Sequence, residues 1–370
     1  MTVMTMGFAA LLVIHGLIHI LGAAKAFGWA DLPQLTQPIS PAMGTLWLVS
    51  ALLWVAAAVS LFVWPRWWWA IAACALAVSM VVIVPSWADA KAGAAANGLV
   101  FVGIVFGFLS QGPLSLRAEY DNDVRRHVAT VASPSSVTDA DLAHLPGPVQ
   151  KYLRMAGVVG HPRVRNFRVR LHGRIRSDRD GRWMPLAAEQ FNVVGHAARL
   201  FYLNASMFAI PVQGYHRYVG SSASMRVKVA ALVPVADAAG PEMTQSETVT
   251  LFNDMCLMAP ATLIEPSIEW ESIDERTARA RFTNAGHTIG AVLSFNDTGE
   301  LIDFESGDRS QGSADGAMIR RKWSTPVRGY RTYGSVRLLS SGEGRWHDAD
   351  GSYPYIELTI DDVRYNVQPG

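Results

Sequence analysis

The chain has 370 residues, of which half are apolar and 17% are charged, and this length accommodates two domains. Of its 32 basic and 31 acidic residues, only five lie within residues 1–111. This asymmetry excludes a single soluble globule and intrinsic disorder, and two cysteines exclude a disulfide framework. Basic and acidic residues balance beyond residue 111, so no bulk charge recruits nucleic acid. The composition predicts a membrane half followed by a soluble half.

Four apolar stretches occupy the first half, at residues 6–24, 42–64, 67–85 and 94–110. A helix needs about 20 residues to cross a hydrocarbon core of about 30 Å. Backbone amides in lipid must be satisfied internally, which makes such spans helical. The first stretch follows no basic residue and is too long for a cleaved signal peptide. We therefore expect a four-helix membrane domain over residues 1–111.

The orientation of these helices follows from the distribution of Lys and Arg. More basic residues fall on the side of the amino terminus than on the opposite side: Arg66, Arg117, Arg125 and Arg126 against Lys25 and Lys91. Since basic loops favour the cytoplasmic side, the count predicts a multi-pass inner-membrane protein with its soluble domain in the cytoplasm.

Two histidines are the most informative polar residues in the membrane half. His15 and His19 lie one helical turn apart, so their imidazoles project from one face. Both lie near the middle of the first span, where ionisable groups are costly and usually face a partner or a cavity. One hypothesis is a redox, quinone or proton-relay site that also uses Asp89 and Lys91, and the alternative is hydrogen bonding to a neighbouring helix. Asp89 and Lys91 also fit interfacial anchoring at the end of the third span.

Residues 112–137 are predicted to form a linker and residues 138–370 a β domain. Two short helices precede residue 162, after which the hydrophobic period changes from that of a helix to that of a strand. One helix interrupts the later strands, with a capping box at Thr244 and Glu247 and its end before Pro260. Strands are predicted at residues 167–176, 199–204, 213–219, 225–231, 268–274, 279–284, 289–295, 301–305, 330–338 and 355–365. The pattern predicts a mainly antiparallel β domain, a curved sheet or open barrel with one main helix.

The first of these strands has one basic face. It presents Arg168, Arg170, His172, Arg174 and Arg176 in alternation with apolar residues. Such a face would bind anionic lipid headgroups, or it is neutralised across the strands by acidic residues such as Glu357 and Asp361.

No catalytic signature is present: the sequence lacks a Walker A loop, G-x-G-x-x-G, H-E-x-x-H, C-x-x-C and G-x-S-x-G. We therefore assign no catalytic residue, metal ligand or cofactor. The apolar side chains Phe201, Met207 and Phe208, with Met255 of the predicted helix, form either ordinary core or the lining of a hydrophobic-ligand site.

Three segments carry a resemblance to a known family: residues 145–154 (LPGPVQKYLR), 260–264 (PATLI) and 268–274 (IEWESID). They resemble an uncharacterised bacterial family known only as a domain of unknown function. The similarity covers most of residues 140–366, and the whole chain is similar to the longer form with four preceding membrane helices. The resemblance implies no activity. More loosely, the order of sheet, helix and sheet is similar to lipoprotein-carrier half-barrels, which hold acyl chains on a concave sheet.

Three functions remain open at this point. The favoured one is binding of a membrane lipid or other hydrophobic small molecule by the β domain. The alternatives are a redox or quinone-linked membrane enzyme that uses His15 and His19, and a membrane-anchored protein-interaction module with no defined partner.

Overall fold

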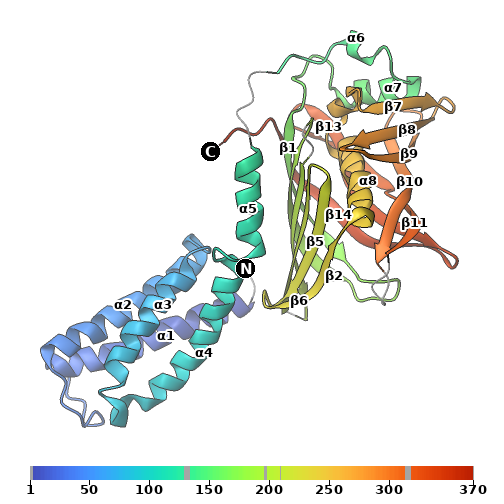
Figure 1. The fold of residues 1–370 in the computed structure, drawn as a ribbon. Coiled ribbons are helices and arrows are strands. Elements are labelled where there is room, and N and C mark those ends of the chain that lie inside the picture. The colour runs from blue at the N-terminus through green and yellow to red at the C-terminus, as the bar shows by residue number, and fades with distance from the viewer. Residues whose placement is uncertain (1–2, 129–133, 196–197, 209, 313–317, 370) are drawn as a thin grey trace. The chain divides into compact units, whose positions relative to one another are not determined.

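The computed structural model describes residues 3–128, 134–195, 198–208, 210–312 and 318–369. The chain divides into two compact units, Met1–Glu119 and Tyr120–Gly370. The first unit is helical, whereas the second is built mainly from strands (Figure 1).

Four helices make up most of the first unit: α1 (Val3–Ala26), α2 (Pro41–Val63), α3 (Trp68–Ile83) and α4 (Trp87–Gln111). Within the described residues, three helical segments are long and apolar enough to cross a membrane: Met4–Ala26, Pro41–Val63 and Trp87–His127. The third predicted span is not confirmed, because α3 has 16 residues and at 1.5 Å per residue falls short of the hydrocarbon core. Asp89 and Lys91 do not end that span, since both lie near the start of α4.

The second unit begins within α5 (Leu116–His127), which lies inside the segment 112–137 assigned to a linker; residues 129–133 of that segment are outside the described residues. Two short helices follow, α6 (Asp139–Leu142) and α7 (Gly147–Ala156). Tyr120 of α5 packs its ring against those of Tyr202 and Tyr215, so this part of α5 covers one face of the sheet.

The described residues of this unit form one antiparallel sheet of fourteen strands. Its strands are β1 (Asn166–Ile175), β2 (Met184–Val193), β3 (Ala198–Met207), β4 (Ile210–Val219), β5 (Ser222–Val229), β6 (Val233–Ala239), β7 (Ile268–Ser272), β8 (Thr277–Asn284), β9 (His287–Phe295), β10 (Leu301–Gly312), β11 (Met318–Ser324), β12 (Val327–Tyr333), β13 (Val336–Asp348) and β14 (Gly351–Tyr365). The order is β6-β5-β4-β3-β2-β1-β14-β13-β11-β10-β9-β8-β7, and β12 pairs with β13.

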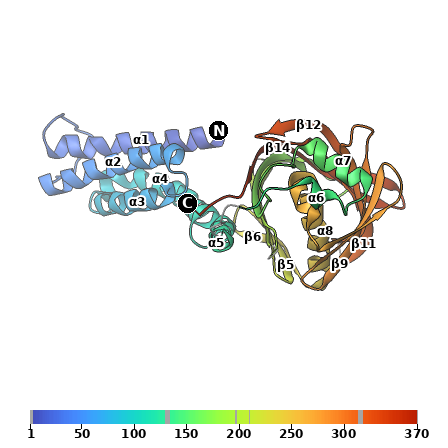
Figure 2. The same ribbon diagram turned by 90° about the horizontal axis from the view of Figure 1, so that it is seen from above.

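The sheet curls around α8 (Pro241–Met258), which is followed by the short helix η1 (Pro260–Ile264) (Figure 2). We call the side that faces α8 the inner face and the opposite side the outer face. Nearly every residue of α8 from Met243 onward is buried, and the apolar side chains of the inner face join it in one core. Tyr152 of α7 donates a hydrogen bond to the carbonyl oxygen of Cys256 at 2.7 Å. The predicted curved antiparallel sheet with one main helix is confirmed.

Three details differ from the sequence prediction. Strands β2, β6 and β11 were not predicted. The single strand expected over 330–338 is the hairpin of β12 and β13, which turns at Gly334 with a φ of +61°. Helix α8 starts at Pro241 and not at Thr244, because Gly240 and Pro241 form its amino terminus. Thr244 and Glu247 therefore do not form a capping box, and both lie inside the helix.

Candidate functional sites

A closed polar cluster lies inside the helical bundle. His15 Nε2 is 2.8 Å from Asn97 Oδ1, and Asn97 Nδ2 donates to Ser79 Oγ at 2.9 Å. Ser79 Oγ is 2.8 Å from His19 Nε2, while His19 Nδ1 is 2.8 Å from the carbonyl oxygen of His15. Because a carbonyl oxygen only accepts, His19 carries a proton on Nδ1. All four side chains are buried, and their hydrogen bonds link α1, α3 and α4.

The structure separates the two pairs of polar residues that the sequence placed in one membrane site. The rings of His15 and His19 lie 4.7 Å apart. Asp89, by contrast, is half-buried and accepts hydrogen bonds from Thr36 Oγ1 and the Gln37 amide, both at 2.7 Å. Lys91 is exposed. Among the described residues, no three His, Cys, Asp or Glu side chains are close enough to hold a metal ion.

A second polar network lies between α8 and the inner face. Arg199 of β3 donates to Asp254 at 2.6 Å and to Glu247 at 2.9 Å. Gln190 of β2 donates to Asp254 at 2.7 Å, and His216 Nδ1 of β4 is 3.3 Å from Glu247. Burial raises the pKa of Glu247, but the charge of Arg199 and the hydrogen bond from His216 outweigh it and hold that pKa at about 2. Burial dominates at Asp254 and raises its pKa.

This Arg199 network pins α8 against three neighbouring strands. Its two carboxylates and its guanidinium are almost completely buried and all have partners, so the arrangement has the character of a structural ion-pair network. The network was not predicted from the sequence, because Glu247 was expected in a capping box with Thr244. The spacing of Glu247 and Asp254 could have indicated it, since two helical turns separate them and place both carboxylates on one face of the helix.

The four side chains predicted to bind a hydrophobic ligand have different environments. Phe201 and Met255 are buried in the core, and Met207 is partly buried against it. Phe208 is 70% exposed. It occupies the β3–β4 turn, so the structure places it at the end of the sheet and not in the interior.

Phe208 belongs to an exposed apolar group that we call the apolar rim. Its members are Phe208, Ile210, Leu232, Val233 and Val235. Pairing of Met207 with Ile210 and of Val229 with Val233 places the β3–β4 and β5–β6 turns at one end of the sheet. A hydrogen bond from the Ala230 amide to the Pro211 carbonyl joins them at 2.8 Å.

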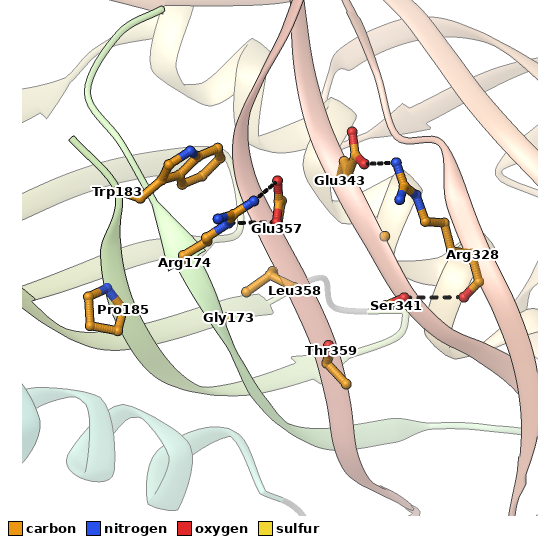
Figure 3. Close-up of a pocket in the computed structure, with 11 residues that line it drawn as sticks. Gly173, Arg174, Trp183, Pro185, Arg328, Ser341, Glu343, Glu357, Leu358 and Thr359 are labelled. Carbon is orange, nitrogen blue, oxygen red and sulfur yellow. Dashed lines mark hydrogen bonds and ion pairs between the residues drawn. The ribbon is translucent and has the colours of Figure 1, made fainter. Parts of the chain in front are cut away.

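An open pocket of about 440 Å³ lies on the outer face, across β1, β2, β12, β13 and β14 (Figure 3). Arg174 binds Glu357 in bidentate fashion, at 2.7 and 2.8 Å, and its guanidinium lies 4.4 Å from the ring centre of Trp183. Arg328 pairs with Glu343 at 2.5 Å. The hydrogen bonds from Arg174 lower the pKa of Glu357.

The basic face of β1 is neutralised across the strands, as one of the two hypotheses predicted. Besides the Arg174–Glu357 pair, His172 Nδ1 lies 2.7 Å from Asp361. Arg168 lies 3.2 Å from Glu189, and Arg170 lies 3.4 Å from Asp362. The face therefore carries little net charge for anionic headgroups.

The chain is thus a helical unit of apolar segments joined to a curled antiparallel sheet that wraps one helix. It belongs to a family of unknown function, DUF6544, whose model matches residues 135–358. No curated protein is significantly similar to it. The family defines no activity.

Two solved structures are similar to the chain at low identity. A domain assigned as an outer membrane lipoprotein-sorting protein, from Vibrio parahaemolyticus, is 10% identical over 54% of this chain and 85% of its own, with a TM-score of 0.32. A DUF1329 family protein from Desulfovibrio piger is 12% identical over 63% of this chain and 95% of its own, with a TM-score of 0.34.

Proposed function

We propose that this chain is an inner-membrane protein whose β domain, on the cytoplasmic side, binds acyl chains of membrane lipid at the apolar rim. The observation that carries the proposal is the gathering of five exposed large apolar side chains at one end of the sheet. Large exposed apolar patches on soluble domains mark ligand, membrane or protein interaction sites.

Phe208 supports the proposal most strongly. Its apolar side chain is exposed to solvent, and a bulky residue is unfavourable at its backbone conformation, so the stability of the fold does not explain a phenylalanine here. Its φ is +51°, a left-handed conformation that is unfavourable for a bulky residue. Glycine would adopt it without strain. The guanidinium of Arg182 lies 4.5 Å from the ring centre of Phe208, which places a cation beside the apolar rim where a lipid phosphate would sit.

Membrane lipid is the hydrophobic ligand that the composition of the chain favours. The first unit contains three helical segments long and apolar enough to cross a membrane, so the β domain belongs to a chain that meets membrane lipid.

The direct test is photo-cross-linking of the full chain in nanodiscs that contain a phospholipid with a photoactivatable acyl chain. We expect adducts on peptides that carry Phe208 to Ile210 or Leu232 to Val235, in addition to those on α1, α2 and α4. Phe208→Gly combined with Leu232→Ser should remove most of the β-domain adducts without loss of folding.

Ile273→Ser is the matched control, since Ile273 is also exposed but follows β7, at the opposite edge of the sheet. It should leave the adducts on the apolar rim unchanged. Adducts confined to residues 1–111 would contradict the proposal and favour a protein partner for the rim. A reporter fused after Gly370 tests the orientation, and periplasmic reporter activity would reverse it.

A further inference from the structure

Two arginines face each other across neighbouring strands of the inner face. Arg309 of β10 and Arg321 of β11 are register partners, so their side chains project from the same side of the sheet. Arg309 lies against Trp323 and Trp346, at 4.4 and 5.2 Å from the ring centres. Like charges placed directly opposite destabilise a strand pair, so this pair works against the fold.

Neither arginine has a carboxylate partner among the residues that the structure describes. The buried Nε atoms of Arg309 and Arg321 have no hydrogen-bond acceptor there, and neither has the indole Nε1 of Trp323. Trp323 is only 3% exposed. Arg309 Nη1 donates to the hydroxyl of Tyr355 at 2.7 Å, which is a neutral acceptor. Three unused donors therefore gather on one small area of the inner face.

The cations next to Arg321 on the same strand do have carboxylate partners. Arg320 and Lys322 flank Arg321 on β11 and project from the outer face, where they pair with Asp308 and Glu305. On α8, Glu247 senses the charge of Arg309, but its two oxygens are hydrogen-bonded to Arg199 and His216. The positive charge of Arg309 and Arg321 is thus left without a paired anion in the part of the chain that the structure describes.

We propose that Arg309, Arg321 and Trp323 form a binding site for a carboxylate or phosphate group. Guanidinium groups offer planar paired donors that match both anions, and a charge-assisted hydrogen bond in a partly buried place is stronger than one in water. The indole N–H adds a third donor. The anion is either free or the headgroup of an amphiphile whose chain lies on the apolar inner face. This site is separate from the apolar rim and does not depend on acyl binding there.

The experiment is thermal unfolding of the full chain in a maltoside detergent, with titration of inorganic phosphate and of hexyl phosphate. We expect a saturable rise of the melting temperature with at least one probe. Arg321→Gln should weaken the binding about tenfold or more, since it removes charge-assisted hydrogen bonds. Without phosphate this variant should be at least as stable as the wild type, because the like-charge contact is gone, so loss of binding cannot be attributed to unfolding.

Arg320→Gln is the matched control, since Arg320 is adjacent but projects from the outer face. It should bind within about twofold of the wild type. Trp323→Phe keeps an aromatic ring but removes the indole N–H, and it should weaken the binding severalfold. Tighter binding of hexyl phosphate than of inorganic phosphate identifies an amphiphile, and equal binding identifies a free anion.

Two results would overturn the site: no saturable shift of the wild type with either probe, or retention of full affinity by Arg321→Gln. The variant Phe208→Gly distinguishes failure of the anion site from failure of acyl binding at the apolar rim. That variant should bind inorganic phosphate normally, whatever the cross-linking of the apolar rim shows.

Discussion

Two groups of arginines on the inner face of one sheet have opposite surroundings. Arg199 lies between Glu247 and Asp254, and its hydrogen bonds are made within the protein. Arg309 and Arg321 face each other and have no carboxylate partner among the described residues. A buried charge is tolerated when it is paired, whereas an unpaired one is expensive.

The presence or absence of a carboxylate partner distinguishes polar groups with a structural role from those that remain available to a ligand. The Arg199 network resembles the His15–Asn97–Ser79–His19 cluster of the helical bundle, whose side chains also form their hydrogen bonds with other protein atoms. Such closed networks fix the positions of helices. Arg309 contacts two tryptophan rings and the Tyr355 hydroxyl, but no carboxylate among the described residues offsets its like-charge contact with Arg321, so we assign the pair to binding.

The largest effect is expected from Arg199→Met. It leaves two buried carboxylates without a cation, and breaking a buried pair in this way costs about 3 to 5 kcal/mol. Denaturant unfolding of the full chain measures it. The triple variant Arg199→Met/Glu247→Leu/Asp254→Leu is the control and should recover part of the loss, because it removes the unpaired carboxylates but leaves Gln190 and His216 without their acceptors. A single variant as stable as the wild type would show that Arg199 does not hold α8.

The acid sensitivity of the β domain should depend on Glu247. Its pKa is lowered from 4.5 to about 2 in the folded state, so its contribution to stability is complete above pH 4.5 and disappears as the pH falls towards 2. The difference in melting temperature between wild type and Glu247→Gln should therefore shrink as the pH is lowered through this range. Glu271→Gln, at an exposed ion pair with Arg279, is the control. If the difference in melting temperature did not change with pH, ionised Glu247 would not be a source of stability.

A smaller effect is expected in the helical bundle. Asn97→Leu removes the acceptor of His15 and a donor to Ser79, and a hydrogen bond between membrane helices is worth about 1 kcal/mol. His15→Leu and His19→Leu should likewise insert and fold with modest losses, and the absorbance spectrum of the purified protein should not change. A Soret band or other chromophore signal that disappears in either histidine variant would instead support the redox hypothesis.

The smallest effect is the stabilisation by Arg321→Gln without phosphate. Relief of a directly opposed like-charge pair is worth about 0.2 to 1 kcal/mol. The measurement is the melting temperature in a phosphate-free buffer, with Arg320→Gln for comparison. If Arg321→Gln lowered the melting temperature and Arg320→Gln did not, Arg321 would have a structural role.

The sequence was sufficient for features that depend on period and length. It located α1, α2 and α4, the curled antiparallel sheet and the main helix. It did not resolve the β12–β13 hairpin, because Gly334 lies between two segments of similar composition. It placed Glu247 at a helix cap, because the start of α8 is set by Gly240 and Pro241.

The binding groups depend on register, which a single sequence does not reveal. Arg309 and Arg321 become neighbours only when β10 pairs with β11, and β11 was not predicted. Phe208 was singled out as part of a hydrophobic-ligand site in the sheet, whereas the structure places it, exposed, after the end of β3. The membrane-site residues Asp89 and Lys91 were grouped with the histidines only because they share an apolar region.

Native mass spectrometry of the full chain in a mild detergent tests the central claim most directly. The wild type should retain lipid, and Phe208→Gly/Leu232→Ser should retain less of it, whereas Ile273→Ser should match the wild type. Equal lipid retention by the rim variant and the wild type, or a wild type without bound lipid, would contradict lipid binding by the β domain.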